Sequence, residues 1–499
     1  INMTKPNIVY FVADQMRNDA LHHMGCEASI TPNLDALVDE GVSFANAYCQ
    51  NPVCVPSRCS FMTGLYPHTT GHRTIHYMQN AGEPNFLRTM KEQGYEVIWV
   101  GRNDLIPADI AKSEFCDRYY DGTHVNKADY VSNNHAKPHP TKDSDEVEPH
   151  AEPGYYAHFR GKITEEQAHA AGRTGGTDWG CIEDALAYIE EKSKDPGSKP
   201  FFLYVTLTYP HPPYACEDPW YSMIDRSKCE PRRPSACDLD KPSMLKAIAS
   251  RQNLRDWGDE NFIEMRAVYL AMTSRFDHQF GMLKDKLKEC GFYDNTSIFV
   301  FSDHGDYTGD YDIAEKVQNC YEDPVVNVPL IVKPAAQFEV KPRISKALVE
   351  LVDITATVEA MTGVKTEYVN FGKSMLEALA GSETHKDAVF CEGGRIHGEY
   401  WAMERGHNAD SEYWPRLSAQ CSEGPEHTKG VMCRMGDLKY VKRLYEKDEL
   451  YDLTVDPKEL NNVIDDPKYA DDVQKMKLRI LDWYMETADW VPNRKDPRW

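Results

Sequence analysis

Residues 54–64 read Cys54-Val55-Pro56-Ser57-Arg58-Cys59-Ser60-Phe61-Met62-Thr63-Gly64, and this stretch says most about the fold and chemistry of the chain. Proline suits the first turn of a helix, where its missing N–H costs nothing, so Cys54 is predicted to lie just ahead of a helix N-terminus. Backbone N–H groups and the helix dipole favour anions there. The guanidinium of Arg58 adds two parallel donors for an oxyanion. The stretch therefore predicts a small reactive side chain in an anion site.

Two simpler explanations fit the same residues. Cys54 could be an ordinary buried thiol before a helix, or it could form half of a zinc site with Cys59. A zinc site is disfavoured because the chain lacks the paired cysteine and histidine spacing of known zinc modules. The rest of the chain has to decide between these interpretations.

Outside this stretch, short β-rich runs alternate with helical patterns, which predicts a mostly parallel α/β sheet covered by helices. The expected strands are Asn7–Ala13, Tyr95–Val100, Phe201–Thr208, Ser297–Phe301, Val328–Val332 and Ala388–Phe390. The expected helices are Pro32–Glu40, Thr177–Lys194, about 261–290 and Asp353–Met361. Helices of this length suit crossovers between parallel strands.

The sequence changes character after about residue 380. Residues 435–441 and 449–453 predict antiparallel strands, and residues 470–487 predict a final helix. We therefore expect a catalytic α/β domain over residues 1–380 and a smaller α+β subdomain, with an antiparallel sheet and a helix, over 381–499. Two long polar insertions, about 105–176 and 212–258, interrupt the first domain. Long loops of this kind are often functional, and we expect them to wall the pocket and select the substrate.

Composition limits the partners. Of 499 residues, 41% are hydrophobic and the formal net charge is −23, which argues against nucleic acid or an anionic membrane as the main partner. No run approaches the roughly 20 apolar residues that span a bilayer. The 14 scattered cysteines are typical of reduced thiols. If Met3 is the native start, no signal peptide precedes the first strand, and we expect a cytoplasmic location; a removed signal peptide would leave the same beginning.

Polar residues follow the expected strands where each one ends. Asp14 and Gln15 follow the first strand and Asp303 and His304 the fourth. Ligands of doubly wound sheets bind beyond the carboxyl ends of the strands. Two carboxylates, an amide oxygen and an imidazole form a donor set for a divalent cation, although each aspartate could instead cap the next helix. Further polar residues in the same positions are Arg102, Asp104, His211, Glu392 and Arg395.

Taken together, these motifs resemble the type I sulfatases of the alkaline phosphatase superfamily. The signature Cys-x-Pro-Ser-Arg stands at 54–58, and Ser-Asp-His-Gly stands at 302–305. The family's lysine and histidine match Lys316 and His211, and its C-terminal Leu-Tyr-Asp-Leu matches residues 450–453. The chain departs from the family where Asp14-Gln15 replaces Asp-Asp, and where Arg102 and Asp104 replace a lysine and a histidine.

The resemblance implies an alkaline-phosphatase-like fold and an enzyme that hydrolyses sulfate esters. Cys54 would be oxidised to formylglycine by a maturation enzyme, and its hydrate would attack sulfur. The implied metal ligands are Asp14, Gln15, Asp303, His304 and residue 54, with Ca²⁺ as the family's usual ion and Mn²⁺ as the alternative. Arg58, Lys316 and Arg102 would neutralise the ester oxygens, and His211 would protonate the leaving alcohol.

The expected substrate is a small anion, a sulfated carbohydrate by family habit and because the polar insertions suit hydroxyl recognition. Candidate substrate contacts are His76, Asp104, Arg395 and His397. Two alternatives stay open at this point. One is a phosphonate monoester or phosphodiester hydrolase on the same scaffold, suggested by Asp14-Gln15 with Asp303-His304. The other is a non-catalytic protein that binds anions or glycans and keeps Cys54 as a thiol.

Overall fold

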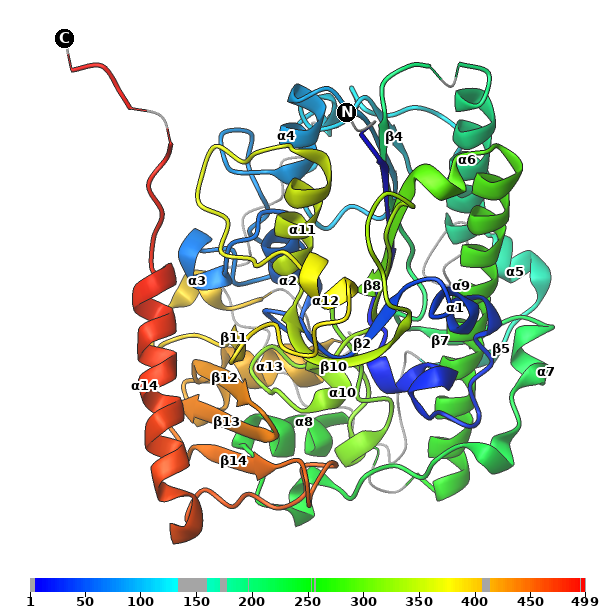
Figure 1. Ribbon diagram of the computed structural model, residues 1–499. Helices are drawn as coiled ribbons and strands as arrows, with labels where there is room; N and C mark the ends of the chain where they lie inside the picture. The colour runs from blue at the N-terminus through cyan, green and yellow to red at the C-terminus, as the bar shows by residue number, and fades with distance from the viewer. Residues whose placement is uncertain are drawn as a thin grey trace.

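The computed structural model describes residues 5–132, 159–170, 177–195, 197–252, 254, 257–405, 413–493 and 495–498 (Figure 1). Its strands are β1 (Asn7–Ala13), β2 (Val42–Tyr48), β3 (Glu96–Gly101), β4 (Arg118–Tyr120), β5 (Phe159–Lys162), β6 (Phe201–Thr206), β7 (Tyr214–Cys216), β8 (Thr296–Ser302), β9 (Leu330–Lys333), β10 (Arg343–Glu350), β11 (Val389–Gly393), β12 (Gly430–Met435), β13 (Leu438–Arg443) and β14 (Glu449–Asp452). Its α-helices are α1 (Pro32–Leu37), α2 (Cys54–Phe61), α3 (Pro67–Thr70), α4 (Phe86–Glu92), α5 (Glu165–His169), α6 (Thr177–Lys192), α7 (Trp220–Met223), α8 (Ser243–Gln252), α9 (Asp259–Glu289), α10 (Asp323–Val326), α11 (Asp353–Thr362), α12 (Leu376–Leu379), α13 (Trp414–Cys421) and α14 (Ala470–Thr487).

The large sheet has eight strands in the order β10-β2-β9-β8-β1-β6-β3-β4. Within the described part of this sheet, only β9 is antiparallel to its neighbours, β2 and β8. The central strand β1 pairs in parallel with β6 on one side and β8 on the other. Every residue of β1 is buried, as expected for a strand covered on both faces. The predicted mostly parallel sheet is therefore confirmed.

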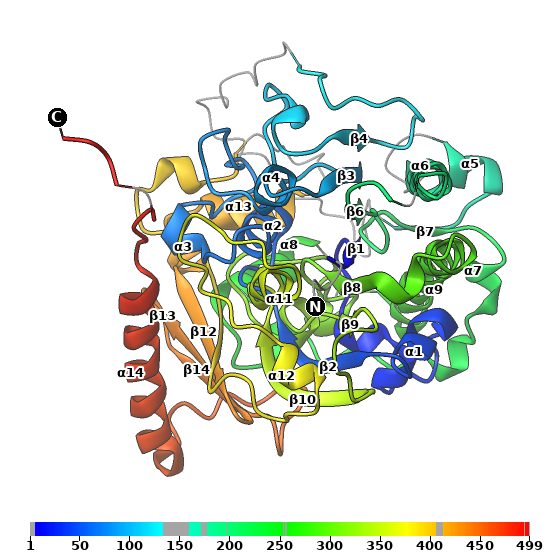
Figure 2. The same ribbon diagram turned by 45° about the horizontal axis from the view of Figure 1, so that its top comes forward.

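Helices cover both faces of this sheet (Figure 2). Alternate residues of β1 point to opposite sides, so Phe11 contacts Phe276 and Phe280 of α9 at ring-centroid distances of 4.8 and 5.4 Å. On the other face Phe61, the last residue of α2, meets Phe301 of β8 edge to face at 5.0 Å. That contact seats α2, and with it Cys54, over the ends of the central strands.

The second sheet is antiparallel, in the order β11-β12-β13-β14, and α14 lies alongside it (Figure 1). Trp483 of α14 stacks on Phe390 of β11 with ring centroids 4.5 Å apart and planes within 7°. The expected C-terminal sheet and helix are both present, and α14 spans the predicted residues 470–487. The boundary near residue 380 stays a prediction.

Several expectations were wrong. Residues 388–390 were expected to extend the parallel sheet, yet Val389 and Phe390 belong to β11 and pair antiparallel with β12, and Ala388 precedes this strand. The expected strand at 328–332 is β9, which also runs antiparallel. The insertion at 212–258 is not a plain loop, because it contains β7, α7 and α8. Parts of both insertions, residues 133–158, 171–176, 253 and 255–256, lie outside the described residues.

Gly305 fixes how the segment after β8 passes the start of α10. Its N–H donates to Val325 O at 2.8 Å, and the next N–H, of Asp306, donates to Pro324 O at 2.9 Å. A Cβ on Gly305 would lie 1.9 Å from Pro324 O, which is backbone and cannot rotate away. Only glycine therefore lets Asp303 and His304 take their places.

Replacing Gly305 by alanine should lower the free energy of unfolding by roughly 1–3 kcal/mol, the usual cost of overpacking a buried site. Urea denaturation monitored by tryptophan fluorescence measures this. Gly82→Ala is the matched control, because a Cβ there has no atom within 4 Å and should cost no more than about 0.5 kcal/mol. Equal stabilities of the two variants would contradict the proposed close approach at Gly305.

Candidate active site

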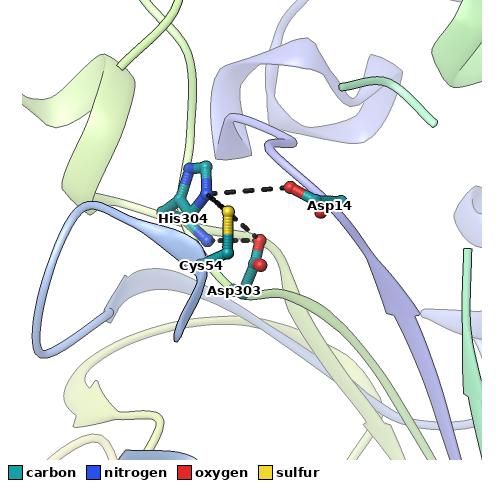
Figure 3. A group of neighbouring side chains, drawn as sticks. All are labelled: Asp14, Cys54, Asp303 and His304. Carbon is teal, nitrogen blue, oxygen red and sulfur yellow. Dashed lines mark hydrogen bonds and ion pairs between the residues drawn. The ribbon is translucent and has the colours of Figure 1, made fainter. Parts of the chain in front are cut away.

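The carboxyl ends of adjacent strands bring the predicted residues together. Ala13 of β1 pairs with Ser302 of β8, so the residues that follow them, Asp14 and Asp303, emerge side by side. Cys54 is the first residue of α2 rather than the residue before it. Figure 3 shows Asp14, Cys54, Asp303 and His304 converging on one point from three segments far apart in the sequence.

These four side chains form a donor cluster. The Nε2 atom of His304 lies 3.4 Å from Cys54 Sγ, 3.7 Å from Asp14 Oδ1 and 3.8 Å from Asp303 Oδ1 (Figure 3). The Nδ1 atom of His304 lies 2.9 Å from Gly305 O and donates to it, which leaves the Nε2 lone pair facing the cluster. Asp14 Oδ1 is buried without a hydrogen-bond partner. An orphaned carboxylate oxygen beside an imidazole nitrogen whose one hydrogen-bond partner among the described residues is the Cys54 thiol fits a divalent cation.

Gln15, a predicted ligand, has its amide oxygen engaged elsewhere. Oε1 accepts from Lys316 Nζ at 2.6 Å, and Nε2 donates to Asp306 Oδ2 at 2.7 Å. The backbone at Gln15 has φ of 71°, a strained conformation for a residue other than glycine. The strain lets its N–H donate to Asp303 Oδ1 at 3.1 Å, so Gln15 links the cluster to Lys316.

Arg58 has a different place from the one expected. Its Nε donates to Asp303 Oδ2 at 2.9 Å, and its Nη2 donates to Asp14 Oδ2 at 3.1 Å. All three side chains have no exposed surface. Arg58 therefore holds the two carboxylates together and does not line the cavity described next; its expected contact with ester oxygens stays a prediction.

A cavity of about 200 Å³ opens above the cluster. Among the described residues its lining comprises Cys54, Val55, Ile75, Arg102, Asp104, His211, Lys316, Tyr413, Arg416 and Leu417. Five of these, Cys54, Arg102, Asp104, His211 and Lys316, were predicted. No described residue of the two polar insertions lines it, so the expectation that the insertions wall the pocket is wrong for the described parts.

Burial and charge keep the Cys54 thiol protonated. Burial raises its pKa most, Lys316 acts in the opposite direction, and Asp14, Asp104 and Asp303 raise it further, to about 12. At neutral pH almost no thiolate is present, and the thiolate is the nucleophilic form. The unmodified side chain is therefore a poor nucleophile in this site.

Lys316 and His211 form a hydrogen-bonded pair in the cavity. The Nζ of Lys316 lies 3.0 Å from His211 Nε2, and His211 Nδ1 lies 2.6 Å from Pro212 O. Burial first, and then the charge of Lys316, lower the pKa of His211 well below its usual value. For Lys316 burial acts downward, but Cys54, Glu315 and Asp14 raise its pKa. The pair therefore consists of a neutral imidazole, not the expected acid, that accepts from a charged ammonium.

Arg102 and Asp104, which follow β3, line the cavity on the side of the main sheet. Arg102 Nη1 lies 3.1 Å from Asp14 Oδ2, and its Nε donates to Asp104 Oδ2 at 2.6 Å. Burial opposes the charge of Asp14, yet the positive charges of Arg102 and Arg58 hold the pKa of Asp14 far below its usual range. Asp14 is thus ionised and ready to bind a cation.

Three predicted substrate contacts lie outside the cavity lining. His76 is exposed. Arg395 is buried and donates to Gln420 O and Ser422 O. His397 belongs to a separate group with Glu423 and His427 whose possible ligand atoms lie within 4.8 Å of one another.

The far wall of the cavity, formed by Ile75, Tyr413, Arg416 and Leu417, was not predicted from the sequence. Ile75 lies in the turn after α3, and Tyr413, Arg416 and Leu417 come from the start of α13. The sequence contains no catalytic motif there. In the chain α13 lies between β11 and β12 of the second sheet, and it contacts α8, where Arg251 donates to Ser418 Oγ at 2.8 Å.

The chain is similar in sequence and fold to known proteins. The sulfatase family model matches residues 6–364. The choline-sulfatase of Rhizobium meliloti is 26% identical over 97% of this chain and 88% of its own. An ulvan-active sulfatase of Formosa agariphila is 26% identical over 77% of this chain and 67% of its own length. The phosphonate monoester hydrolase of Agrobacterium radiobacter shares the fold, with a TM-score of 0.71 at 21% identity over 98% of this chain and all of its own.

No helix in the described part of the chain is both long and apolar enough to cross a membrane. The match over residues 6–364 covers well over half of the chain and includes all the clustered residues. The chain therefore belongs to the sulfatase family of the alkaline phosphatase superfamily.

Proposed function

We propose that this sulfuric ester hydrolase removes sulfate from a sulfated carbohydrate, with formylglycine at position 54 as the nucleophile and a divalent cation beside it. The observation that carries the proposal is the convergence of Cys54, Asp14, Asp303 and His304 at the floor of a cavity flanked by Lys316 and Arg102.

Several features of Cys54 support its conversion. The pKa of the thiol, about 12, makes the unmodified residue unreactive. Its position at the first turn of α2 directs backbone N–H groups towards an attached oxyanion. A hydrated aldehyde there would supply one hydroxyl to attack sulfur and a second to expel sulfate. The proposal therefore includes a formylglycine-generating maturation enzyme as a partner.

The cation site rests on the chain's own donors. Asp14 Oδ1, Asp303 Oδ1 and His304 Nε2 would hold the ion, and Arg58 keeps the two carboxylates in place. When bound, a divalent cation would polarise the ester and lower the pKa of the attacking hydroxyl. Ca²⁺ is the ion expected from the family, and the imidazole donor also suits Mn²⁺.

Lys316 and His211 divide the remaining work. The Lys316 ammonium and the Arg102 guanidinium face the cavity and would neutralise the charge that grows on the ester oxygens. A hydrogen bond joins Lys316 Nζ to His211 Nε2. The Lys316 ammonium would protonate the leaving oxygen, and His211 Nε2, which accepts from the same ammonium, would hold it in place instead of acting as the free imidazolium first expected.

The form of the cavity favours a single sugar ring. Pockets for drug-sized ligands occupy roughly 300–1,000 Å³, so about 200 Å³ holds one small ring with its ester. Ile75 and Leu417 offer apolar surface to the C–H faces of a ring, and Asp104 offers a carboxylate to a hydroxyl. The named relatives include a choline-sulfatase and an ulvan-active sulfatase, so family membership alone does not select the substrate. The proposal of a single sugar ring therefore rests on the size and lining of the cavity.

A parallel release assay tests the function. Protein produced together with a formylglycine-generating enzyme is given sulfated monosaccharides, a phosphonate monoester and a phosphodiester at equal concentrations. Sulfate release from a sugar should have the highest kcat/KM. A higher kcat/KM for the phosphorus esters would instead assign the chain to phosphonate or phosphodiester hydrolysis.

Cys54→Ala should reduce sulfate release to background, because it removes the nucleophile. Cys59→Ala, a buried cysteine one turn further along α2, is the matched control and should keep its activity. Turnover that survives in Cys54→Ala would refute the formylglycine mechanism.

Protonation of the leaving oxygen by Lys316, held by His211, predicts a dependence on the leaving group. His211→Asn should lower kcat for a sugar sulfate by about 10²–10⁴-fold, because a sugar alcohol needs a proton as it leaves. The same variant should change kcat far less for 4-nitrophenyl sulfate, whose phenolate leaves unprotonated. Similar losses on both esters would show that His211 acts in some other way.

A further inference from the structure

Arg416, on the first turn of α13, is an unusual residue in the cavity wall. Its side chain lines the cavity with Cys54 and Lys316, yet the residue is only 4% exposed. Among the described residues neither Nε nor Nη1 of Arg416 has a hydrogen-bond partner. The guanidinium carbon of Arg416 lies 5.8 Å from the centroid of the Tyr413 ring. A buried guanidinium thus faces the cavity with donors to spare.

The other buried arginines show what is missing. Each of them forms an ion pair with a carboxylate: Arg17 with Asp310, Arg58 with Asp303, Arg275 with Glu217, Arg395 with Glu423, Arg434 with Asp437 and Arg443 with Glu449. No ion pair of this kind involves Arg416 in the described part of the chain. A buried charge without a partner is costly, so folds rarely keep one unless a ligand completes it.

Glu404 is an acidic group whose pKa the charge of Arg416 lowers; its Oε1 is engaged, and its Oε2 has no hydrogen-bond partner among the described residues. Its Oε1 accepts from the N–H of Ile75 at 2.8 Å and from the amide of Gln318. Burial raises the pKa of Glu404, and Arg416 and Lys316 act in the opposite direction. Glu404 therefore offsets part of the charge at a distance and leaves the donors of Arg416 unused.

We propose that Arg416 binds a second anionic group of the substrate, a carboxylate or a second sulfate carried by the same sugar ring as the scissile ester. This inference rests on the proposed sulfatase function and names its substrate class. The small cavity places both anions on one ring, and a guanidinium matches the planar geometry of a carboxylate or two oxygens of a sulfate. The same charge disfavours esters of cationic alcohols, whose ammonium group would face Arg416.

Three classes of ester test the proposal: a uronic acid sulfate, a disulfated hexosamine and a neutral hexose sulfate. Arg416→Met should lower kcat/KM for the anionic sugars by about 10–100-fold, mainly through KM, as expected for the loss of charge-assisted hydrogen bonds. For the neutral ester the change should stay below about 3-fold. The two anionic arms show whether the second group is a carboxylate or a sulfate.

Arg251→Met is the matched control. Arg251 lies on α8, donates to Ser418 Oγ of α13 at 2.8 Å and stands over the ring of Trp414, but it does not line the cavity. Its loss should affect all three esters alike. Equal losses on neutral and anionic esters in Arg416→Met would overturn the proposal, and so would a selective loss in Arg251→Met.

Two measurements without turnover separate this inference from the proposed function. Calorimetry with glucuronate, which carries no sulfate ester, should give a weaker Kd for Arg416→Met than for the native protein. The Tm of the ligand-free Arg416→Met protein should be unchanged or higher, because an unpaired buried charge is removed. If no sugar sulfate is hydrolysed but the calorimetry and the Tm agree with these expectations, the anion site is supported and the proposed sulfatase function is refuted. No glucuronate binding, or a Tm several degrees lower, would refute the anion site itself.

Discussion

The ion pairs that join Arg58 to Asp14 and Asp303 are the constraint on which the rest of this structure depends. Two carboxylates emerge from adjacent strands of one sheet with no exposed surface, an arrangement that would be unstable without a cation. Arg58 supplies that charge from α2, the same helix that begins with Cys54. One guanidinium therefore ties the helix that carries the nucleophile to the residues that follow two adjacent strands.

In this arrangement the second oxygen of each carboxylate faces the cluster: Asp14 Oδ1 has no hydrogen-bond partner among the described residues, and Asp303 Oδ1 accepts from the N–H groups of Gln15 and His304. Asp303 Oδ2 and Asp14 Oδ2 face Arg58, whereas the Oδ1 atoms face His304 and Cys54. Each carboxylate is thus shared between a structural cation and the reactive cluster. The far wall of the cavity comes from a different part of the chain, the start of α13. There Arg416 adds a positive charge to that of Lys316.

Much of this could be predicted from the sequence because local signals carried it. The runs that became β1, β3, β6 and β8 are short, apolar and followed directly by polar residues, so both the strands and the residues at their ends were foreseen. The edge strand β10 was missed because charged side chains interrupt its apolar positions, as expected at a sheet edge. The place of Arg58 was missed because a motif gives a residue's type but not its partner.

The far wall could not be predicted for a different reason. Arg416 lies more than 300 residues from Cys54 in sequence, on a helix between β11 and β12 that reaches the cavity through tertiary packing, including its contact with α8. Sequence patterns report strands and helices but not which loop faces which pocket. The fold class was confirmed, while one half of the cavity emerged only from the structure.

The central claim is that Asp14, Asp303 and His304 hold a cation beside residue 54. Anomalous diffraction from crystals of the matured protein grown with Mn²⁺ tests it directly. The account predicts a peak bounded by Asp14 Oδ1, Asp303 Oδ1 and His304 Nε2, with Arg58 still bonded to both carboxylates. A site empty of anomalous signal, or a peak only at the His397, Glu423 and His427 group, would contradict it.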